Sequence, residues 1–138
     1  MWILPSRARP HNLRRFLQAY IDTGASTPVW VRLDHDDVMA GAYLVNHPNW
    51  SITSGERKPL SDIYAEAFHR FPNASYYGFI ADDVVPRTMK WDRRLIEVAG
   101  NDGMAVPSGG HEDYAGAPHF VLGGDLVRSI GWLALPGL

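Results

Sequence analysis

Two adjacent carboxylates, Asp82 and Asp83, directly follow an uncharged run and are the first candidates for chemistry. The run at 76–81 is typical of a strand that is buried on both faces, and Pro86 prevents that strand from continuing. Carboxylates at the end of a buried strand are costly unless something compensates their charge. A hard divalent cation that holds a phosphate group would compensate it. The pair therefore predicts a cation site, and the alternative is that these acids cap a helix or a turn.

Two other polar segments also follow runs that predict strands. The acidic segment 34–37 follows an alternating run at 29–33, and the segment Ser6–Arg9 follows the apolar run 2–4. Carboxyl ends of parallel strands meet at the same edge of a sheet, so the three polar segments should share one crevice. Taken alone, the acids of 34–37 fit helix or turn caps equally well, and the arginines fit solvated surface residues. Together the segments predict a site for a nucleotide diphosphate bridged by a divalent cation, with the arginine forks matching phosphate oxygens.

Three weaker candidates lie in the last third of the chain. Asp113 stands in the glycine-rich loop 108–116 and could reach a substrate, although an exposed flexible loop is the simpler interpretation. Asp125 stands at the start of an expected helix, where it caps that helix or takes a proton as a general base. His119 opens an expected strand, and we expect a half-buried strand residue there rather than a metal ligand. Asp113 and Asp125 are thus the candidate catalytic carboxylates.

Hydrophobic periodicity predicts the elements that would position these side chains. Strands are expected at 2–4, 29–33, 50–53, 76–81, 104–106 and 119–122, and helices at 13–21, 38–45, 60–71, 91–99 and 125–130. Asn12 is expected to cap the first long helix, and Gly24 to end it. Strands that alternate with helices are typical of an α/β domain with a mainly parallel sheet and right-handed crossovers.

Composition narrows the class of protein. A chain of 138 residues with 46% hydrophobic and 20% charged residues predicts one globular domain, 1–138, rather than a disordered chain. A net charge of -2 gives no basic surplus that would indicate a nucleic-acid partner. The chain has no cysteine and no apolar run of membrane-spanning length, so we expect a cytoplasmic protein without a membrane span.

Three stretches resemble a known family. The segment Leu4–Pro10 resembles the Pro-[Ser/Thr]-Arg-x-Arg-Pro start of glycosyltransferase-like proteins with the GT-A nucleotide-diphospho-sugar transferase fold, which are frequent in phages and actinobacteria. The segment Phe79–Asp92 resembles their Phe-x-Gly-Asp-Asp-x-x-Pro-Arg-Thr-x-x-Trp-Asp stretch, which is the most specific of the three. The segment Phe120–Leu138 resembles a later strand–helix–turn segment. The resemblance implies a Rossmann-like, three-layer α/β/α sandwich with a mostly parallel central sheet.

The same resemblance implies a metal-dependent glycosyltransferase that moves a sugar from a UDP- or GDP-linked donor to an unknown acceptor. Mn²⁺ or Mg²⁺ would be held by a DxD-like motif and would stabilise the leaving diphosphate. Asp83 is the implied first metal ligand, and Asp82 is implied to touch the metal, the ribose or the sugar. Residues implied to contact the nucleotide sugar are Pro5, Ser6, Arg7, Arg9, Asp34, Asp36 and Asp82.

The sequence departs from the family pattern in two ways. Position 84 is Val, where an Asp-x-Asp motif read from Asp82 would place its last acid. The chain also ends at Leu138, whereas relatives continue into a segment with acceptor-binding residues and often a catalytic carboxylate or a late metal-binding histidine. The expected fold is therefore minimal or truncated at its C-terminus, and a homodimer could cover the exposed end.

Two other functions stay open at this stage. A truncated transferase fold could be a non-catalytic module that binds a sugar nucleotide without turnover. A receiver-like phosphoacceptor domain would also place paired acids at strand ends, but it needs a lysine after a late strand, and the only lysines are Lys58 and Lys90.

Overall fold

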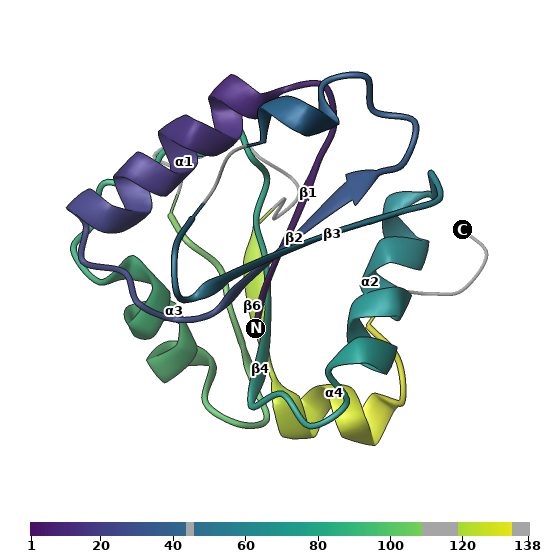
Figure 1. Cartoon of the computed structure of the whole chain (residues 1–138). Coiled ribbons are helices and arrows are strands. Elements are labelled where there is room, and N and C mark those ends of the chain that lie inside the picture. The colour runs from purple at the N-terminus through teal and green to yellow at the C-terminus, as the bar shows by residue number, and fades with distance from the viewer. Residues whose placement is uncertain (44–45, 109–118, 134–138) are drawn as a thin grey trace.

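The computed structural model describes residues 1–43, 46–108 and 119–133, and the account of the structure is confined to them. Along the chain the elements are β1 (Trp2–Ser6), α1 (Pro10–Asp22), β2 (Val29–Asp34), a short 3-10 helix (Ala40–Ala42), β3 (Trp50–Gly55), α2 (Leu60–Arg70), β4 (Tyr76–Phe79), α3 (Trp91–Ala99), β5 (Met104–Ala105), β6 (Phe120–Gly123) and α4 (Gly124–Ile130) (Figure 1).

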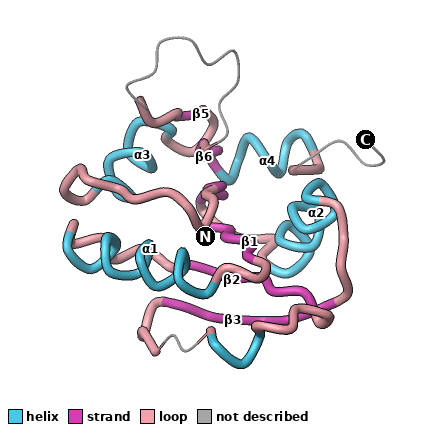
Figure 2. The backbone as a smooth tube through the Cα atoms, turned by 90° about the horizontal axis from the view of Figure 1, so that it is seen from above, coloured by secondary structure: helices cyan, strands magenta, loops and turns pink. Residues whose placement is uncertain are grey.

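The strands form one sheet in the order β3-β2-β1-β4-β6-β5. β1 pairs in parallel with β2 and with β4, and β2 pairs in parallel with β3, whereas β6 runs antiparallel to both of its neighbours. This is the expected α/β class with a mostly parallel sheet. The strand order reverses between β1 and β4, which is the topological switch point of such a sheet. Figure 2 shows β3, β2 and β1 following one another on one side of the sheet and β6 and β5 on the other.

Helices cover both faces of the sheet, with α1 and α3 on one side and α2 and α4 on the other (Figure 1). Successive side chains of a strand point to opposite faces, so β1 places Trp2 and Leu4 in one core and Ile3 in the other. The first core also contains Phe16 of α1 and Trp91 of α3. The second contains Ile63 and Ala67 of α2 and Val127 of α4. The molecule is thus a three-layer α/β/α sandwich, as expected.

Helix α1 begins earlier than the sequence suggested. Pro10 occupies its first turn, where the missing N–H is no loss and the fixed φ suits a helix. The N-cap is Arg9, whose side chain makes no capping hydrogen bond, so the prediction that Asn12 caps this helix is wrong. Gly24 follows the helix with φ +64°, as a helix-ending glycine should. No helix in the described residues is long and apolar enough to cross a membrane.

One further local prediction is corrected by the fold, and one buried acid connects two of its elements. The helix expected at 38–45 is only the 3-10 turn at 40–42, and residues 44–45 lie outside the described part. Asp92, in the first turn of α3, is fully buried and accepts hydrogen bonds from the backbone and hydroxyl of Thr27 and from the backbone of Ser26. It therefore ties α3 to the loop that leads into β2.

Candidate functional site

The polar segments that follow β1, β2 and β4 converge at the carboxyl edge of the sheet. Arg9, after β1, lies 3.0 Å from Asp82, after β4, and Arg7 lies 2.8 Å from Asp34 at the end of β2. In open α/β sheets ligands bind outside this edge, at the switch point. The convergence arises because β1, β2 and β4 are adjacent and parallel, so their ends face the same way.

Asp82 contacts residues at the end of β1 and in the following loop, and it is also a candidate metal ligand. Its side chain is 0% exposed, and its Oδ2 accepts a hydrogen bond from the hydroxyl of Ser6. Its Oδ1 lies 3.0 Å from Arg9 Nη2 but has no hydrogen-bond partner among the described residues. A buried carboxylate oxygen held only by an ion pair is an acceptor that can still take a ligand. Asp83, by contrast, is 59% exposed and is paired with Arg9 Nη1 at 3.8 Å.

Tyr43 also takes part in the contacts around Ser6 and Arg9, and no pattern in the sequence predicts this role. Its hydroxyl lies 3.1 Å from Ser6 Oγ and accepts a hydrogen bond from the backbone nitrogen of Arg9 at 2.9 Å. Burial raises the pKa of Tyr43, although its hydrogen bonds with Ser6 and Arg9 oppose that rise. A neutral hydroxyl at pH 7 therefore fixes the loop that carries Ser6 and Arg9.

Arg7 joins the first loop to the acidic end of β2. Its Nη1 bonds to Asp34 Oδ2 at 2.8 Å and to Asp36, and its Nη2 bonds to Asp36 Oδ2 at 3.1 Å. The hydrogen bond from Arg7 lowers the pKa of Asp36, and the hydrogen bonds to Asp36 and Asp34 raise the pKa of Arg7. Asp34 also lies 3.6 Å from Arg32, a β2 residue whose side chain is 1% exposed and pairs with Glu66 of α2.

Asp37 has a structural role. Its carboxylate accepts hydrogen bonds from the backbone nitrogens of Ala8 and Met39, both at 2.8 Å. Burial opposes its ionisation, but those two hydrogen bonds and others lower its pKa on balance. Ala8 has φ +54°, a left-handed conformation that is unfavourable for alanine. Asp37 therefore holds a strained residue between Arg7 and Arg9, which agrees with the turn-capping alternative for this acid.

The positive charges at this edge are compensated within the protein. Asp34, Asp36, Asp37, Asp82 and Asp83 stand against Arg7, Arg9 and Arg32, so carboxylates outnumber guanidinium groups. Both exposed arginines already have carboxylate partners. A diphosphate that enters the crevice must therefore separate these pairs or bring a cation with it.

The acids fit a divalent cation only in part. Among the described residues no three His, Asp or Glu side chains form a group that could hold a metal ion. Asp82 Oδ1 and the exposed carboxylate of Asp83 do face one guanidinium, and carboxylate oxygens are the ligands that Mg²⁺ and Mn²⁺ prefer. Such a pair fits an ion that takes most of its ligands from phosphate and water, as Mg²⁺ commonly does in nucleotide sites.

A cavity of about 650 Å³ lies beside the acidic loop. Its lining is mainly apolar, with Trp2, Trp91 and Ile80 among the residues, and His119 lies on its wall. His119 is half-buried, and its Nδ1 has no hydrogen-bond partner among the described residues. Burial lowers the pKa of His119 despite the nearby charge of Asp83. The imidazole is therefore neutral at pH 7, close to the proposed cation ligand.

The two candidate catalytic carboxylates are not brought to this site. Asp113 lies outside the described residues. Asp125 follows β6, which runs antiparallel to β4 so that Gly123 pairs with Tyr76 at the start of that strand. Asp125 is therefore at the opposite edge of the sheet, where it pairs with Arg128, and the expectation that it faces the crevice is wrong. Pro5 lies within β1, one residue before the end of the strand, and pairs with Arg32.

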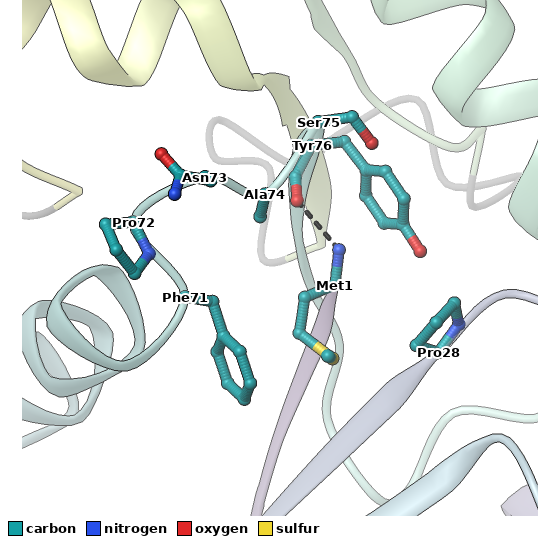
Figure 3. Close-up of a pocket in the computed structure, with 8 residues that line it drawn as sticks. All are labelled: Met1, Pro28, Phe71, Pro72, Asn73, Ala74, Ser75 and Tyr76. Atoms are coloured by element: carbon teal, nitrogen blue, oxygen red, sulfur yellow. Dashed lines mark hydrogen bonds between the residues drawn. The ribbon is translucent and has the colours of Figure 1, made fainter.

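A hollow of about 430 Å³ at that opposite edge differs in character (Figure 3). It is lined by Met1, Pro28 and residues 71–76, and the Met1 nitrogen donates to the Tyr76 carbonyl at 2.8 Å. None of these lining side chains is acidic or basic. The hollow therefore lacks the carboxylate and guanidinium groups that distinguish the carboxyl edge.

Comparisons with known proteins bear on the fold. No family model matches the chain, and no curated protein matches its sequence. The structure of Rv0371c from Mycobacterium tuberculosis H37Rv in complex with manganese is similar, with a TM-score of 0.66 and 15% identity over 98% of this chain and 76% of that one. 4-diphosphocytidyl-2C-methyl-D-erythritol synthase is also similar, with a TM-score of 0.61 and 12% identity over 97% and 86% of the two chains. At these identities the likeness shows a shared α/β fold.

A third similar structure is CMP:2-keto-3-deoxy-manno-octonic acid synthetase complexed with CTP, with a TM-score of 0.55 and 12% identity over 95% of this chain and 76% of that one. These likenesses show a fold shared with these proteins, which is coarser than the sequence resemblance implied. They do not single out the GT-A glycosyltransferases within that group.

Proposed function

We propose that the carboxyl edge binds a UDP- or GDP-linked sugar together with Mn²⁺ or Mg²⁺, and that the protein transfers the sugar to an acceptor. The observation that carries this proposal is the contact between the arginine loop after β1 and the acidic pair after β4, made at the switch point of the sheet. The fold shared with synthetases that act on nucleotides supports it.

The residues have separate tasks in this proposal. Asp83 and Asp82 Oδ1 would hold the cation, which stabilises negative charge on the leaving diphosphate. Arg7 and Arg9 would bind phosphate oxygens through their planar forks once their carboxylate partners are exchanged. Asp34 and Asp36 would then accept hydrogen bonds from the ribose hydroxyls, with Pro5 and Ser6 shaping the wall beside them.

Asp113 is the carboxylate that we retain as the proposed general base. Asp125 is at the opposite edge of the sheet and cannot take a proton from an acceptor at Asp83 without a rearrangement of β6 and α4. His119 is a neutral imidazole beside Asp83, and we propose that it contacts the acceptor or the sugar.

The comparisons favour a second candidate, nucleotidyl transfer, because two of the similar structures are synthetases whose names specify cytidine nucleotides. The two reactions differ in their products. Sugar transfer from a nucleotide sugar releases a nucleoside diphosphate, whereas nucleotidyl transfer from a triphosphate releases pyrophosphate. Product analysis therefore separates them without knowledge of the acceptor.

Isothermal titration calorimetry with UDP and GDP, each with Mn²⁺ and with EDTA, tests the binding half. We expect binding of one nucleotide with Mn²⁺ only, and a loss of at least tenfold in affinity in Asp83→Ala. Asp125→Ala is the matched control, because it removes one carboxylate at the far edge. If neither nucleotide binds with Mn²⁺ present, the proposal is wrong.

Turnover is tested by incubating UDP- and GDP-sugars, and separately CTP, with a panel of acceptors. Release of a nucleoside diphosphate that depends on Asp83 supports sugar transfer, and release of pyrophosphate from CTP supports nucleotidyl transfer. Binding without release of either product would support the alternative of a sugar-nucleotide-binding module.

A further inference from the structure

The guanidinium group of Arg9 stands between the two candidate metal ligands. Its Nη2 lies 3.0 Å from Asp82 Oδ1, and its Nη1 lies 3.8 Å from Asp83 Oδ2. One cation of the protein therefore bridges two carboxylates that follow each other in the chain. This is the position that a divalent cation would take if it used the same two oxygens.

Asp82 needs that positive charge. Its side chain is 0% exposed, and the hydroxyl of Ser6 serves only Oδ2. Oδ1 is buried without a hydrogen bond among the described residues, so Arg9 is the group that compensates it. Without a nearby cation, a buried carboxylate of this kind would strongly disfavour its charged form.

The side chain of Arg9 can move away from Asp82 without disturbing the backbone of its loop. Its side chain is 47% exposed, while its backbone nitrogen is held by the Tyr43 hydroxyl at 2.9 Å. Its neighbour Ala8 is likewise fixed by Asp37 at 2.8 Å. Because the backbone is held by hydrogen bonds and the guanidinium is exposed, the side chain can exchange its carboxylate partners for another anion while the backbone stays in place.

We propose that Arg9 occupies the place of the divalent cation until a nucleotide diphosphate arrives, so that the cation and the diphosphate bind together rather than in sequence. The part that concerns the diphosphate rests on the proposed function. When the diphosphate binds, Arg9 turns to its phosphate oxygens, and Asp83 and Asp82 Oδ1 become available to the cation. Arg9 is then a positioning residue that couples the two ligands.

The proposal predicts opposite effects of Arg9 on the two ligands. A cation that enters alone must displace Arg9 or tolerate a positive charge about 4 Å away, which in bulk water weakens divalent binding by roughly 10- to 30-fold. A diphosphate, in contrast, loses a charge-assisted hydrogen bond when Arg9 is removed, which costs about tenfold or more in affinity. Because coupling is reciprocal, each ligand must raise the affinity of the other by the same factor in the unmodified protein.

The first experiment measures Mn²⁺ binding without nucleotide, by the loss of the free Mn²⁺ signal in electron paramagnetic resonance. Arg9→Ala and Arg9→Gln should bind Mn²⁺ roughly 10- to 30-fold more tightly than the wild type. Arg9→Gln keeps a side chain of similar reach and guards against a general effect of truncation. Arg14→Ala, which removes an exposed positive charge from α1, should bind Mn²⁺ as the wild type does, within about threefold. If both Arg9 variants bind Mn²⁺ no more tightly than Arg14→Ala, the proposal is overturned.

The second experiment titrates UDP and GDP into each protein at saturating Mn²⁺. The affinity for the nucleotide should fall about tenfold or more in Arg9→Ala, and nucleotide should strengthen Mn²⁺ binding by a smaller factor than in the wild type, because only the direct attraction between Mn²⁺ and the diphosphate remains. An Arg9→Ala variant that keeps the wild-type coupling between the two ligands would overturn the proposal. The two proposals can fail separately. The proposed function is tested by nucleotide binding to the wild type, whereas the role of Arg9 is tested by Mn²⁺ binding in the absence of nucleotide.

Discussion

Replacing Asp92 by alanine should destabilise the fold by about 3–5 kcal/mol, because several buried donors lose their acceptor at once. Asp92 Oδ2 accepts from the Ser26 nitrogen at 2.8 Å, the Thr27 nitrogen at 2.9 Å and the Thr27 hydroxyl at 2.8 Å. The side chain is fully buried, so water cannot replace the carboxylate without opening the structure. Each donor left without a partner costs about 1–3 kcal/mol, and local relaxation keeps the total below the sum.

The pKa of Asp92 gives the sign of its effect on stability. Burial raises the pKa, but the hydrogen bonds from Ser26, Thr27 and the backbone of Arg93 outweigh burial and bring the pKa below its ordinary value of 3.8. A carboxyl group with a lowered folded-state pKa stabilises the fold above its unfolded pKa, and this stabilisation is lost as the pH falls through the folded value. The advantage of the wild type over Asp92→Asn should therefore be full at pH 7 and shrink below pH 3.8.

Urea denaturation followed by tryptophan fluorescence measures both effects. Asp92→Asn keeps the shape and one acceptor oxygen, so it should lose about 1–2 kcal/mol at pH 7, less than Asp92→Ala. Glu97→Ala is the matched control, because it removes an exposed acid from the same helix and should change stability by no more than about 0.5 kcal/mol. A loss under about 1 kcal/mol in Asp92→Ala would refute the reasoning, as would a difference between wild type and Asp92→Asn that does not shrink in acid.

Three further substitutions test other parts of the structure. Gly78→Ala should cost about 2–4 kcal/mol in urea denaturation, because a Cβ there would lie 2.2 Å from the ring of Trp2 on the neighbouring strand. Arg32→Met should leave Glu66 with one fewer partner and change stability by about 1–3 kcal/mol, and a denaturation midpoint equal to the wild type would contradict a structural role for this buried pair. Asp125→Asn should leave nucleotide affinity within about twofold, and a larger loss in calorimetry would show that the far edge contributes to the site.

The convergence of the acidic and basic segments could be predicted because it depends on local signals and one general rule. The uncharged run before Asp82 and the alternation before Asp34 mark strands, and adjacent parallel strands deliver their ends to one edge. The contact between Arg9 and Asp82 needs nothing more than that rule and the reach of an arginine.

The position of Asp125 could not be predicted in the same way, because no local signal states the direction of a strand. The pattern of 119–122 fits a strand in either direction, and β6 is the strand that runs against its neighbours.

The role of Tyr43 was missed for a related reason. Its hydroxyl meets Ser6 across 37 positions of sequence, and only the packing of the loops after β1 and β2 brings the two together.

Burial distinguishes the two acids that the sequence offered together as candidate ligands. The side chain of Asp82 is enclosed, whereas that of Asp83 is open to solvent. An enclosed carboxylate can hold a cation only if the compensating charge on Arg9 moves away. The acidic pair therefore does more than provide ligands, because its occupancy is linked to the position of an arginine.

The pairing of the arginines with carboxylates should make nucleotide binding only weakly dependent on salt. Arg7 and Arg9 are both paired with carboxylates, so the crevice presents little free positive charge to an approaching anion. Exposed charges that are compensated at contact distance produce a weak field beyond the Debye length of about 8 Å in physiological salt. Long-range attraction should then contribute little to nucleotide capture, and affinity should come instead from the exchange of partners inside the crevice. Nucleotide affinity measured with Mn²⁺ should accordingly fall less than about tenfold between 50 mM and 500 mM salt, and a steeper dependence would mean that the arginines are free before the ligand arrives.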